Sequence, residues 1–113
     1  MNPVSSREER IGLNEAVFRE VNERIEDLAE TFQLQDEPLD LVCECGDAGC
    51  VRRVSMTCAE YEQLRSDPRH FAVHPGHEYP DVEEVVDRRK GYDVVSKNEE
   101  ITERIAERTD PRS

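Results

Sequence analysis

The longest regular pattern of apolar positions lies between residues 5 and 35. Its apolar side chains recur at spacings of three, four or seven residues, at Ile11, Phe18, Val21, Ile25, Leu28 and Phe32. This period predicts one long helix with a narrow apolar stripe. Two interpretations of the stripe stay open. The helix could lie on its own domain, or it could be an arm that forms a coiled coil or docks on a partner.

The charged residues of the same helix are spaced for ion pairs. Acidic and basic residues stand four positions apart in two places, at Glu15 with Arg19 and at Glu20 with Arg24. Pairs at this spacing are neighbours on the surface of a helix. We therefore expect both pairs on the outer face, opposite the apolar stripe.

Shorter patterns follow Pro38, which cannot continue a helix. Alternating apolar positions predict a β-hairpin from two strands, 39–43 and 50–56. A capping-box sequence, Thr57 to Glu60, opens a short helix that ends before Pro68. Later patterns predict a third strand, a second hairpin and a terminal helix, at 70–74, 82–88 with 92–97, and 99–108.

This order of elements predicts an α+β fold. We expect a long N-terminal helix, followed by a small β-hairpin-based domain with a short helix. The chain divides into three predicted parts, which are an N-terminal helical arm, a zinc-binding α+β domain, and a frayed helix with a disordered tail. Their bounds are 1–37, 38–98 and 99–113.

Three of the four cysteines lie within one short run, at Cys43, Cys45 and Cys50. Cys43 and Cys45 would point the same way on an extended strand. Gly46 and Gly49 would then let the backbone turn, through left-handed or strained conformations, so that the third sulfur joins them. Zinc binds cysteine sulfurs in a tetrahedron, so this run predicts a zinc site at the tip of the first hairpin.

The fourth zinc ligand has three protein candidates, and a water is a further alternative. His77 follows Pro-Gly in a predicted sharp turn, and it is our choice. Cys58 is second, since it would sit in the first turn of a helix, where a thiol pKa is lowered. His74 is third. Glu78 or Asp81 could hydrogen-bond the second nitrogen of a His77 ligand.

The cysteine run resembles a known zinc unit. The order Cys43, Cys45, Gly46 and Cys50, with Arg52 one position late, resembles the post-SET segment of histone-lysine methyltransferases. That segment binds zinc through a C-x-C-G-x3-C run and a further cysteine. The catalytic SET sequence is absent, so the resemblance implies the zinc geometry and no methyltransferase activity.

Most of the chain also resembles a family of short, chiefly actinobacterial proteins of uncharacterised function. The motifs shared with that family are NEAxFREVNERI, CECxxxxC, EYExxR and PGH, at 14–25, 43–50, 60–65 and 75–77. The resemblance implies no activity. It does imply that the turn containing His77 belongs to the same unit as the cysteines.

The charge of the chain restricts its partners. With 27 acidic and 15 basic residues the net charge is −12, and no segment is basic. Nucleic-acid binding needs a positive surface against phosphate, so we expect none. We expect the partner to be another protein, and a basic one would match the charge. The alternative is self-association through the N-terminal helix.

The sequence also gives expectations about location. The residues at the start show no apolar run of the kind found in signal peptides, and no run approaches membrane-spanning length. We therefore expect a cytoplasmic protein that does not bind membranes. Cysteines stay reduced in the cytoplasm, which favours a metal over disulfides.

These observations predict a small zinc-binding protein that acts as a protein–protein interaction or regulatory module. Three thiolates make zinc a weak Lewis acid, which indicates a structural metal rather than an enzyme. The alternative is a thiol-based redox or metal sensor. A zinc or Cys–His hydrolase has less support, because no nucleophile elbow or substrate pocket is visible. A zinc hydrolase would use Glu44, Asp47 or Glu78 as its general base, whereas a Cys–His hydrolase would pair Cys58 with His74 or His77.

Overall fold

The computed structural model describes residues 6–34 and 36–112. It contains three helices and five strands within these residues. The helices are α1 (Arg7–Thr31), α2 (Cys58–Arg65) and α3 (Glu100–Arg108). The strands are β1 (Leu39–Val42), β2 (Arg53–Met56), β3 (His70–Val73), β4 (Glu83–Arg89) and β5 (Tyr92–Lys97). The predicted α+β fold is therefore confirmed.

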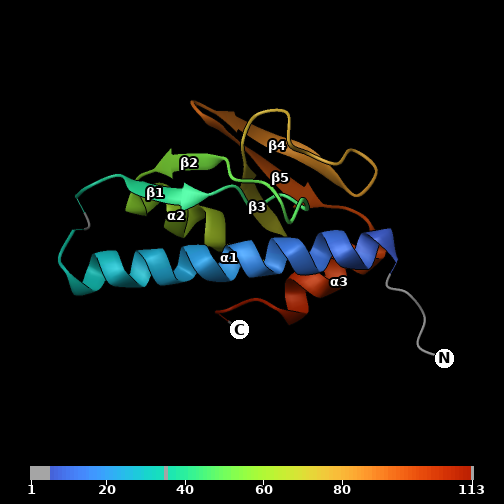
Figure 1. The fold of residues 1–113 in the computed structure, drawn as a ribbon, viewed down its shortest axis with the longest axis horizontal. Coiled ribbons are helices and arrows are strands. Elements are labelled where there is room, and N and C mark those ends of the chain that lie inside the picture. The colour runs from blue at the N-terminus through green and yellow to red at the C-terminus, as the bar shows by residue number, and fades with distance from the viewer. Residues whose placement is uncertain (1–5, 35, 113) are drawn as a thin grey trace.

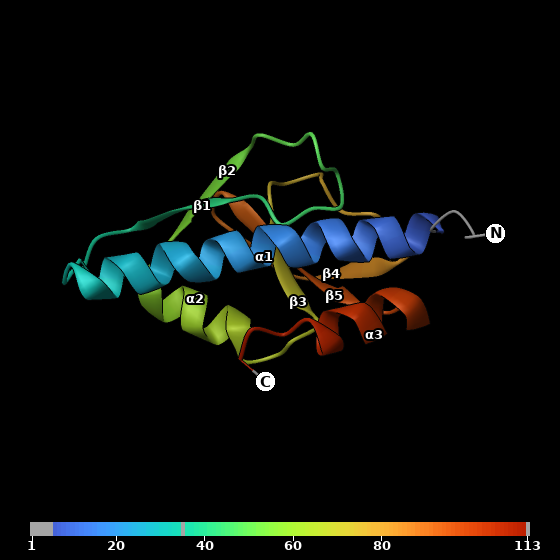
Figure 2. The same cartoon turned by 60° about the horizontal axis from the view of Figure 1, so that its bottom comes forward.

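Helix α1 runs along the whole molecule, with the strands on one side of it (Figure 1). Helices α2 and α3 lie beneath its two halves, and the end of the chain lies between them (Figure 2). Of the two interpretations of α1, the structure shows the first, a helix that lies on its own domain. Among the described residues, no helix has the length and apolar character needed to cross a membrane.

The strands form two small antiparallel sheets. Strands β1 and β2 pair from Leu39 with Met56 to Val42 with Arg53. The second sheet has the order β3-β5-β4, and Gly91 makes its hairpin turn with a φ of 91°. Both hairpins were predicted from the alternation of apolar residues. The backbone N–H of Glu44 donates to Ala72 O at 2.8 Å, which joins the two sheets next to the cysteines.

The apolar core has two parts. One packs β1 and β2 against α2, with Leu41, Val54 and Tyr61 among its members. The other lies around Phe71 and includes the cysteines Cys43 and Cys45. The cysteine run is thus part of the core rather than an exposed loop.

Helix α1 turns its polar side toward this core, contrary to our prediction. Its buried residues are Ile11, Gly12, Glu15, Arg19, Asn22, Glu23 and Glu26. Of the predicted stripe, Ile11 is buried, Phe18 and Ile25 are half-buried, and the other members are exposed. The prediction that Glu15 and Arg19 form an outer ion pair was wrong. Both are buried because other elements supply their partners.

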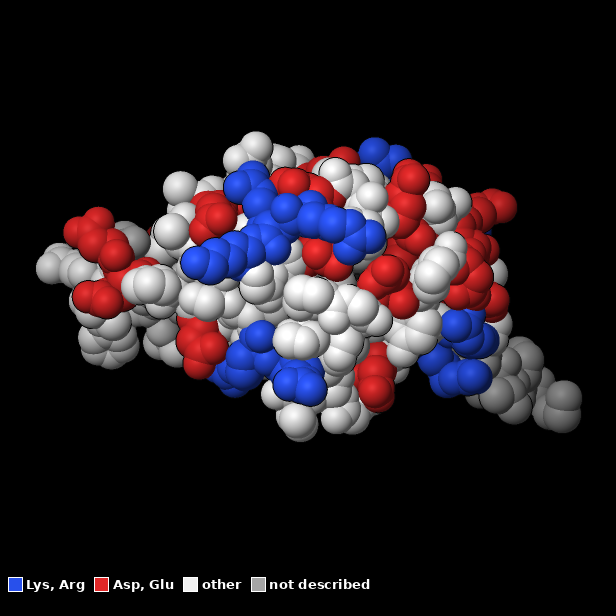
Figure 3. Space-filling view, turned by 90° about the horizontal axis from the view of Figure 1, so that it is seen from above, with Lys and Arg blue, Asp and Glu red and all other residues white. Residues whose placement is uncertain are grey.

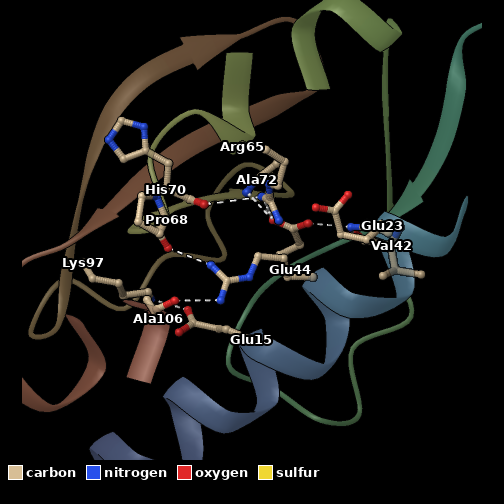
Figure 4. Close-up of polar contacts among 12 residues, drawn as sticks. Glu15, Glu23, Val42, Glu44, Arg65, Pro68, His70, Ala72, Lys97 and Ala106 are labelled. Atoms are coloured by element: carbon tan, nitrogen blue, oxygen red, sulfur yellow. Dashed lines mark hydrogen bonds and ion pairs between the residues drawn. The ribbon is translucent and has the colours of Figure 1, made fainter. Parts of the chain in front are cut away.

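The partner of Glu15 is Lys97, on β5. The Lys97 ammonium is buried and contacts two carboxylates, those of Glu15 and Glu83 (Figure 4 shows Glu15 and Lys97). Burial is the main cause that lowers the pKa of Lys97 and raises that of Glu15 to about 7. A buried charge of this kind is stable only while it is paired.

Arg19 finds its partners at the far end of the chain. Its guanidinium donates to Pro68 O at 2.7 Å, to Ala106 O at 2.8 Å and to Thr109 Oγ1 at 2.9 Å. The same group lies 4.7 Å from the centre of the Phe71 ring, in cation–π geometry. One arginine therefore ties α1 to α3 and to the loop before β3.

The end of the chain is also held by charge. Helix α3 packs along α1. Beyond it, the Arg112 guanidinium donates to Glu23, Glu26 and Glu62, at 2.7–3.1 Å. We expected a frayed helix and a disordered tail here. The described residues up to 112 instead make defined contacts with α1 and α2.

The pKa of Glu26 predicts an unusual dependence of stability on pH. Burial, followed by the hydrogen bond and charge of Glu62, raises the pKa of Glu26 to about 8 from 4.5. Between these values the folded protein keeps a proton that the unfolded chain has lost, so the unfolding free energy falls as pH rises.

We expect Glu26 to lower the unfolding free energy by about 1–2 kcal/mol between about pH 6 and pH 8. Urea titrations with zinc in excess would measure this change. The variant Glu26→Gln cannot ionise, and its unfolding free energy should fall less over the same range. Equal slopes for the two proteins would contradict the prediction.

Candidate metal centre

Four side chains meet where two loops come together. Cys43, Cys45 and Cys50 come from the segment between β1 and β2, and His77 comes from the loop between β3 and β4. One ligand atom from each lies within 4.8 Å of all the others. The predicted zinc ligands, including His77 as the fourth, are thus brought together. Their role as a ligand set stays a prediction.

A turn brings the third sulfur back toward the first two. After Cys45 the backbone turns at Asp47, whose carboxylate accepts the N–H of Gly49 at 2.9 Å. The N–H of Cys50 then donates to Asp47 O at 3.0 Å, which closes the turn. Asp favours such turns because its side chain can bond the backbone two residues later.

Gly46 and Gly49 were expected to supply left-handed or otherwise strained conformations; among the described glycines, only Gly76 and Gly91 have a positive φ. Gly46 is needed for space instead. A Cβ atom at Gly46 would lie 2.6 Å from Ile11 and 2.9 Å from Tyr79, which is too close for carbon atoms. The loop that carries Cys43, Cys45 and Cys50 therefore packs directly on α1. Asn14 reinforces this contact, since its amide donates to Gly46 O at 2.8 Å.

A second turn positions His77. The N–H of His77 donates to His74 O at 3.0 Å, across Pro75 and Gly76. Gly76 has a φ of 89°, which few residues other than glycine adopt. Proline followed by a glycine of positive φ is typical of a type II turn. The Pro-Gly sequence thus directs His77 toward the cysteines, as predicted.

Each of the three sulfurs accepts a backbone hydrogen bond. The N–H of His74 donates to Cys43 Sγ at 3.1 Å. The backbone of Asp47 bonds Cys45, and that of Arg52 bonds Cys50. Such bonds stabilise thiolates over thiols, because N–H donors favour a negatively charged acceptor. The loops therefore suit a cluster of metal-bound thiolates.

The spacing of the cluster fits zinc. The Nδ1 atom of His77 lies 3.7 Å from Cys43 Sγ and 3.6 Å from Cys50 Sγ. In a tetrahedron with Zn–S of about 2.3 Å and Zn–N of about 2.05 Å, the S–N edge is about 3.6 Å. The imidazole and these two sulfurs thus already have the separation that zinc requires. Nδ1 is the nitrogen that faces the sulfurs.

The thiols also influence one another. A hydrogen bond between Cys43 and Cys45 is the first cause that lowers the pKa of Cys45 to about 5 and raises that of Cys43. Burial raises the pKa of Cys50. Three crowded thiols therefore keep some of their protons, and a divalent cation would displace these protons when it binds.

Glu44 stands between two cysteines in the sequence, and its side chain points toward Arg65 and Ala72 (Figure 4). Its side chain is buried and accepts hydrogen bonds from Asn22 at 2.7 Å, Arg65 at 2.6 Å and the Ala72 N–H at 3.0 Å. These donors come from α1, α2 and β3. Glu44 therefore anchors the loop to three elements, a role that our sequence analysis missed although the strand alternation implies its direction.

The other two candidate ligands, Cys58 and His74, are not part of this group of four side chains. Cys58 begins α2 and packs at the edge of the first apolar core. Its pKa is raised, first by burial and then by nearby carboxylates, and not lowered as we expected. His74 contributes its backbone N–H to Cys43, and its ring lies edge-on to that of His77, with 5.0 Å between centres.

The predicted hydrogen-bond partners of His77 are not in place. Asp81 instead contacts Arg7 of α1. Glu78 lines a hollow beside His77, and one of its carboxylate oxygens is buried without a partner among the described residues. The structure thus gives His77 its position through the turn, and not through Asp81.

Comparison with known proteins adds no family to these observations. No protein-family model, no curated protein and no solved structure matches this chain. The role of the cluster must therefore be argued from its own chemistry.

Proposed function

We propose that this protein binds one zinc ion through Cys43, Cys45, Cys50 and His77, and that the zinc is structural. The observation that carries the proposal is that the four ligand atoms lie within 4.8 Å of one another, with His77 Nδ1 at the distance from two sulfurs that a zinc tetrahedron requires. All four positions around the ion would be filled by protein ligands, which leaves none for a substrate. The zinc would crosslink the β1–β2 loop to the β3–β4 loop.

The surroundings of the site support a structural role. Cys43 and Cys45 belong to the core around Phe71, so the ion would stabilise that core directly. Three thiolates and one imidazole leave a zinc site with one net negative charge, which is easier to bury than the two left by four thiolates. We further propose that the stabilised domain acts as a protein–protein interaction or regulatory module.

Replacement of each candidate for the fourth ligand position should have a different effect on zinc binding. We expect His77→Ala to weaken zinc retention by about 10- to 100-fold or more, since even the loss of outer-shell partners of ligands costs this much. Cys58→Ser should change retention much less, and His74→Ala least. Competition with a chromogenic chelator would measure each variant.

Native mass spectrometry of the unmodified protein provides the reference, and it should show one zinc per chain. If Cys58→Ser released the zinc while His77→Ala retained it, four thiolates would form the site. If the purified protein were folded and contained no metal, the proposed function itself would fail.

One observation favours a second function, a thiol-based redox or metal sensor. Cys50 and His77 are only half-buried, and Cys45 and His77 line an open hollow of about 250 Å³. A small oxidant could therefore reach the sulfurs. A sensor would release zinc on mild peroxide treatment and rebind it after reduction, whereas a purely structural site would retain it under the same treatment.

A further inference from the structure

Exposed apolar residues gather along the outer side of α1. Large apolar side chains are exposed at eight positions of the described chain, and six of these lie on α1 or directly after it. The six are Leu13, Val17, Val21, Leu28, Phe32 and Leu34. We call the first three the outer stripe, since they stand four residues apart on one face of the helix. Val17 has an exposed fraction of 61%.

The outer stripe forms the wall of a hollow. Together with Ala16 and Thr109 it encloses a volume of about 450 Å³, open to solvent. Its lining is apolar except at Thr109 and at Glu20 and Arg24, which form an ion pair at 3.7 Å. A side chain of leucine size would fit such a hollow and bury apolar surface that now faces water.

An acidic groove adjoins this hollow. Glu20 and Arg24 line both the hollow and the groove, so the two are direct neighbours on the surface of α1. It has a volume of about 430 Å³, and its acidic side chains outnumber its basic ones six to two, although Glu26 has a pKa of about 8 and stays protonated up to about that pH. The acidic side chains belong to Glu20, Glu23, Glu26, Asp27, Glu30 and Glu62. Arg112 already lies in it and bonds three of them, which shows that the groove accepts a guanidinium.

We propose that the outer stripe and the acidic groove bind an amphipathic, basic helix of another protein. Its apolar side chains would fill the hollow, and its Lys or Arg side chains would enter the groove. Charge selects this occupant over a second copy of the chain. A second copy has a net charge of −12 and would bring an equally acidic groove.

The face opposite α1 differs in charge. Viewed from above in Figure 3, Lys and Arg side chains form a band across it, with Asp and Glu on both sides. That face would attract a basic segment less, so the partner should choose the α1 side. This inference rests on the proposed interaction role of the domain, for which it names the surface and the class of partner.

A synthetic amphipathic helix of leucine and lysine is a suitable probe, with its binding to the zinc-loaded protein followed by fluorescence anisotropy. We expect Val17→Asp to weaken binding by about 10-fold or more, since buried apolar contacts dominate such interfaces. The sign of this change in affinity distinguishes apolar binding from binding by charge alone. Val17→Asp adds negative charge, so binding by charge alone would become tighter.

Val86→Asp is the matched control. Val86 is an exposed apolar residue on β4, and the same substitution there should leave the affinity unchanged. Glu30→Lys should weaken binding through the groove, and a leucine–glutamate peptide with the same apolar face should not bind. Equal affinity of wild type and Val17→Asp for the leucine–lysine peptide would overturn the proposal.

Two further outcomes have distinct meanings. A dimer of the wild-type protein that Val17→Asp dissolves, seen by light scattering, would show a second copy as the occupant and overturn the proposal. Zinc content is measured on every variant. A zinc-loaded wild type that does not bind the leucine–lysine peptide would refute the docking surface alone, whereas a folded wild type without zinc would refute the proposed metal function.

Discussion

Removal of zinc by a strong chelator should unfold the domain. The apparent free energy of binding a structural zinc is about 10–16 kcal/mol, which equals or exceeds the whole stability of a typical small domain, about 5–15 kcal/mol. Here the ion would bridge two loops, and two of its ligands, Cys43 and Cys45, are core residues. Circular dichroism during chelator titration should show loss of helix and strand together, and added zinc should restore both.

Cys45→Ser should reproduce the effect of the chelator, because serine does not replace a thiolate as a zinc ligand. Cys58→Ser is the matched control, since Cys58 lies outside the cluster. The Cys58→Ser variant should unfold only when chelator is added, as we expect of the wild type. Circular dichroism that stays native after complete zinc removal would show that the apolar core suffices without the metal.

Replacement of Lys97 by methionine is expected to destabilise the protein by about 3–5 kcal/mol. Methionine matches the length of the lysine but leaves the carboxylates of Glu15 and Glu83 buried without a cation. Both carboxylates and the ammonium are fully buried, so water cannot replace the lost partner. Urea unfolding in excess zinc would measure the loss.

The control separates lost charge pairing from lost packing. In the triple variant Glu15→Met, Lys97→Met, Glu83→Gln, no charge of the triad remains. The glutamine keeps an oxygen for the Tyr79 N–H, which Glu83 accepts at 3.0 Å. Apolar replacements of buried ion pairs are commonly neutral or stabilising, so this variant should regain most of the stability. A triple variant as unstable as Lys97→Met would assign the effect to packing.

The sheets and the short helix could be predicted from the sequence, because their signals are local. Alternation of apolar residues with the Lys90-Gly91 turn defined the second hairpin, and the capping box from Thr57 to Glu60 defined α2. In both cases the residues that set the structure also make its bonds. Thr57 accepts the N–H of Glu60 at 3.0 Å, and the Glu60 carboxylate accepts that of Thr57 at 2.8 Å.

The orientation of α1 could not be predicted in the same way. Periodicity places apolar residues on one face, but it does not say which face meets the domain. Glu15, Arg19 and Asn22 are buried because their partners lie 20 to 90 residues away in the sequence. No local pattern contains those partners, so the polar face was wrongly assigned to solvent.

The candidate site was predictable where its residues were concentrated. Three cysteines in one run and a histidine after Pro-Gly gave the four side chains that the structure brings together. The supporting bonds were not predictable, because the N–H of His74 and the donors to Glu44 belong to other elements. The reason for Gly46 was also missed, since it depends on how closely α1 approaches.

That close approach would couple the binding of the proposed zinc to the binding of the proposed partner. Ile11 and Asn14 press the inner face of α1 onto Gly46, in the loop that carries the cysteines. The outer stripe is on the other side of the same helix. A partner that binds α1 only while α1 is packed on the cysteine loop would raise the affinity of the protein for zinc. Zinc would then raise the affinity of the protein for the partner by the same factor. Zinc availability would then set how much of the protein is competent to bind.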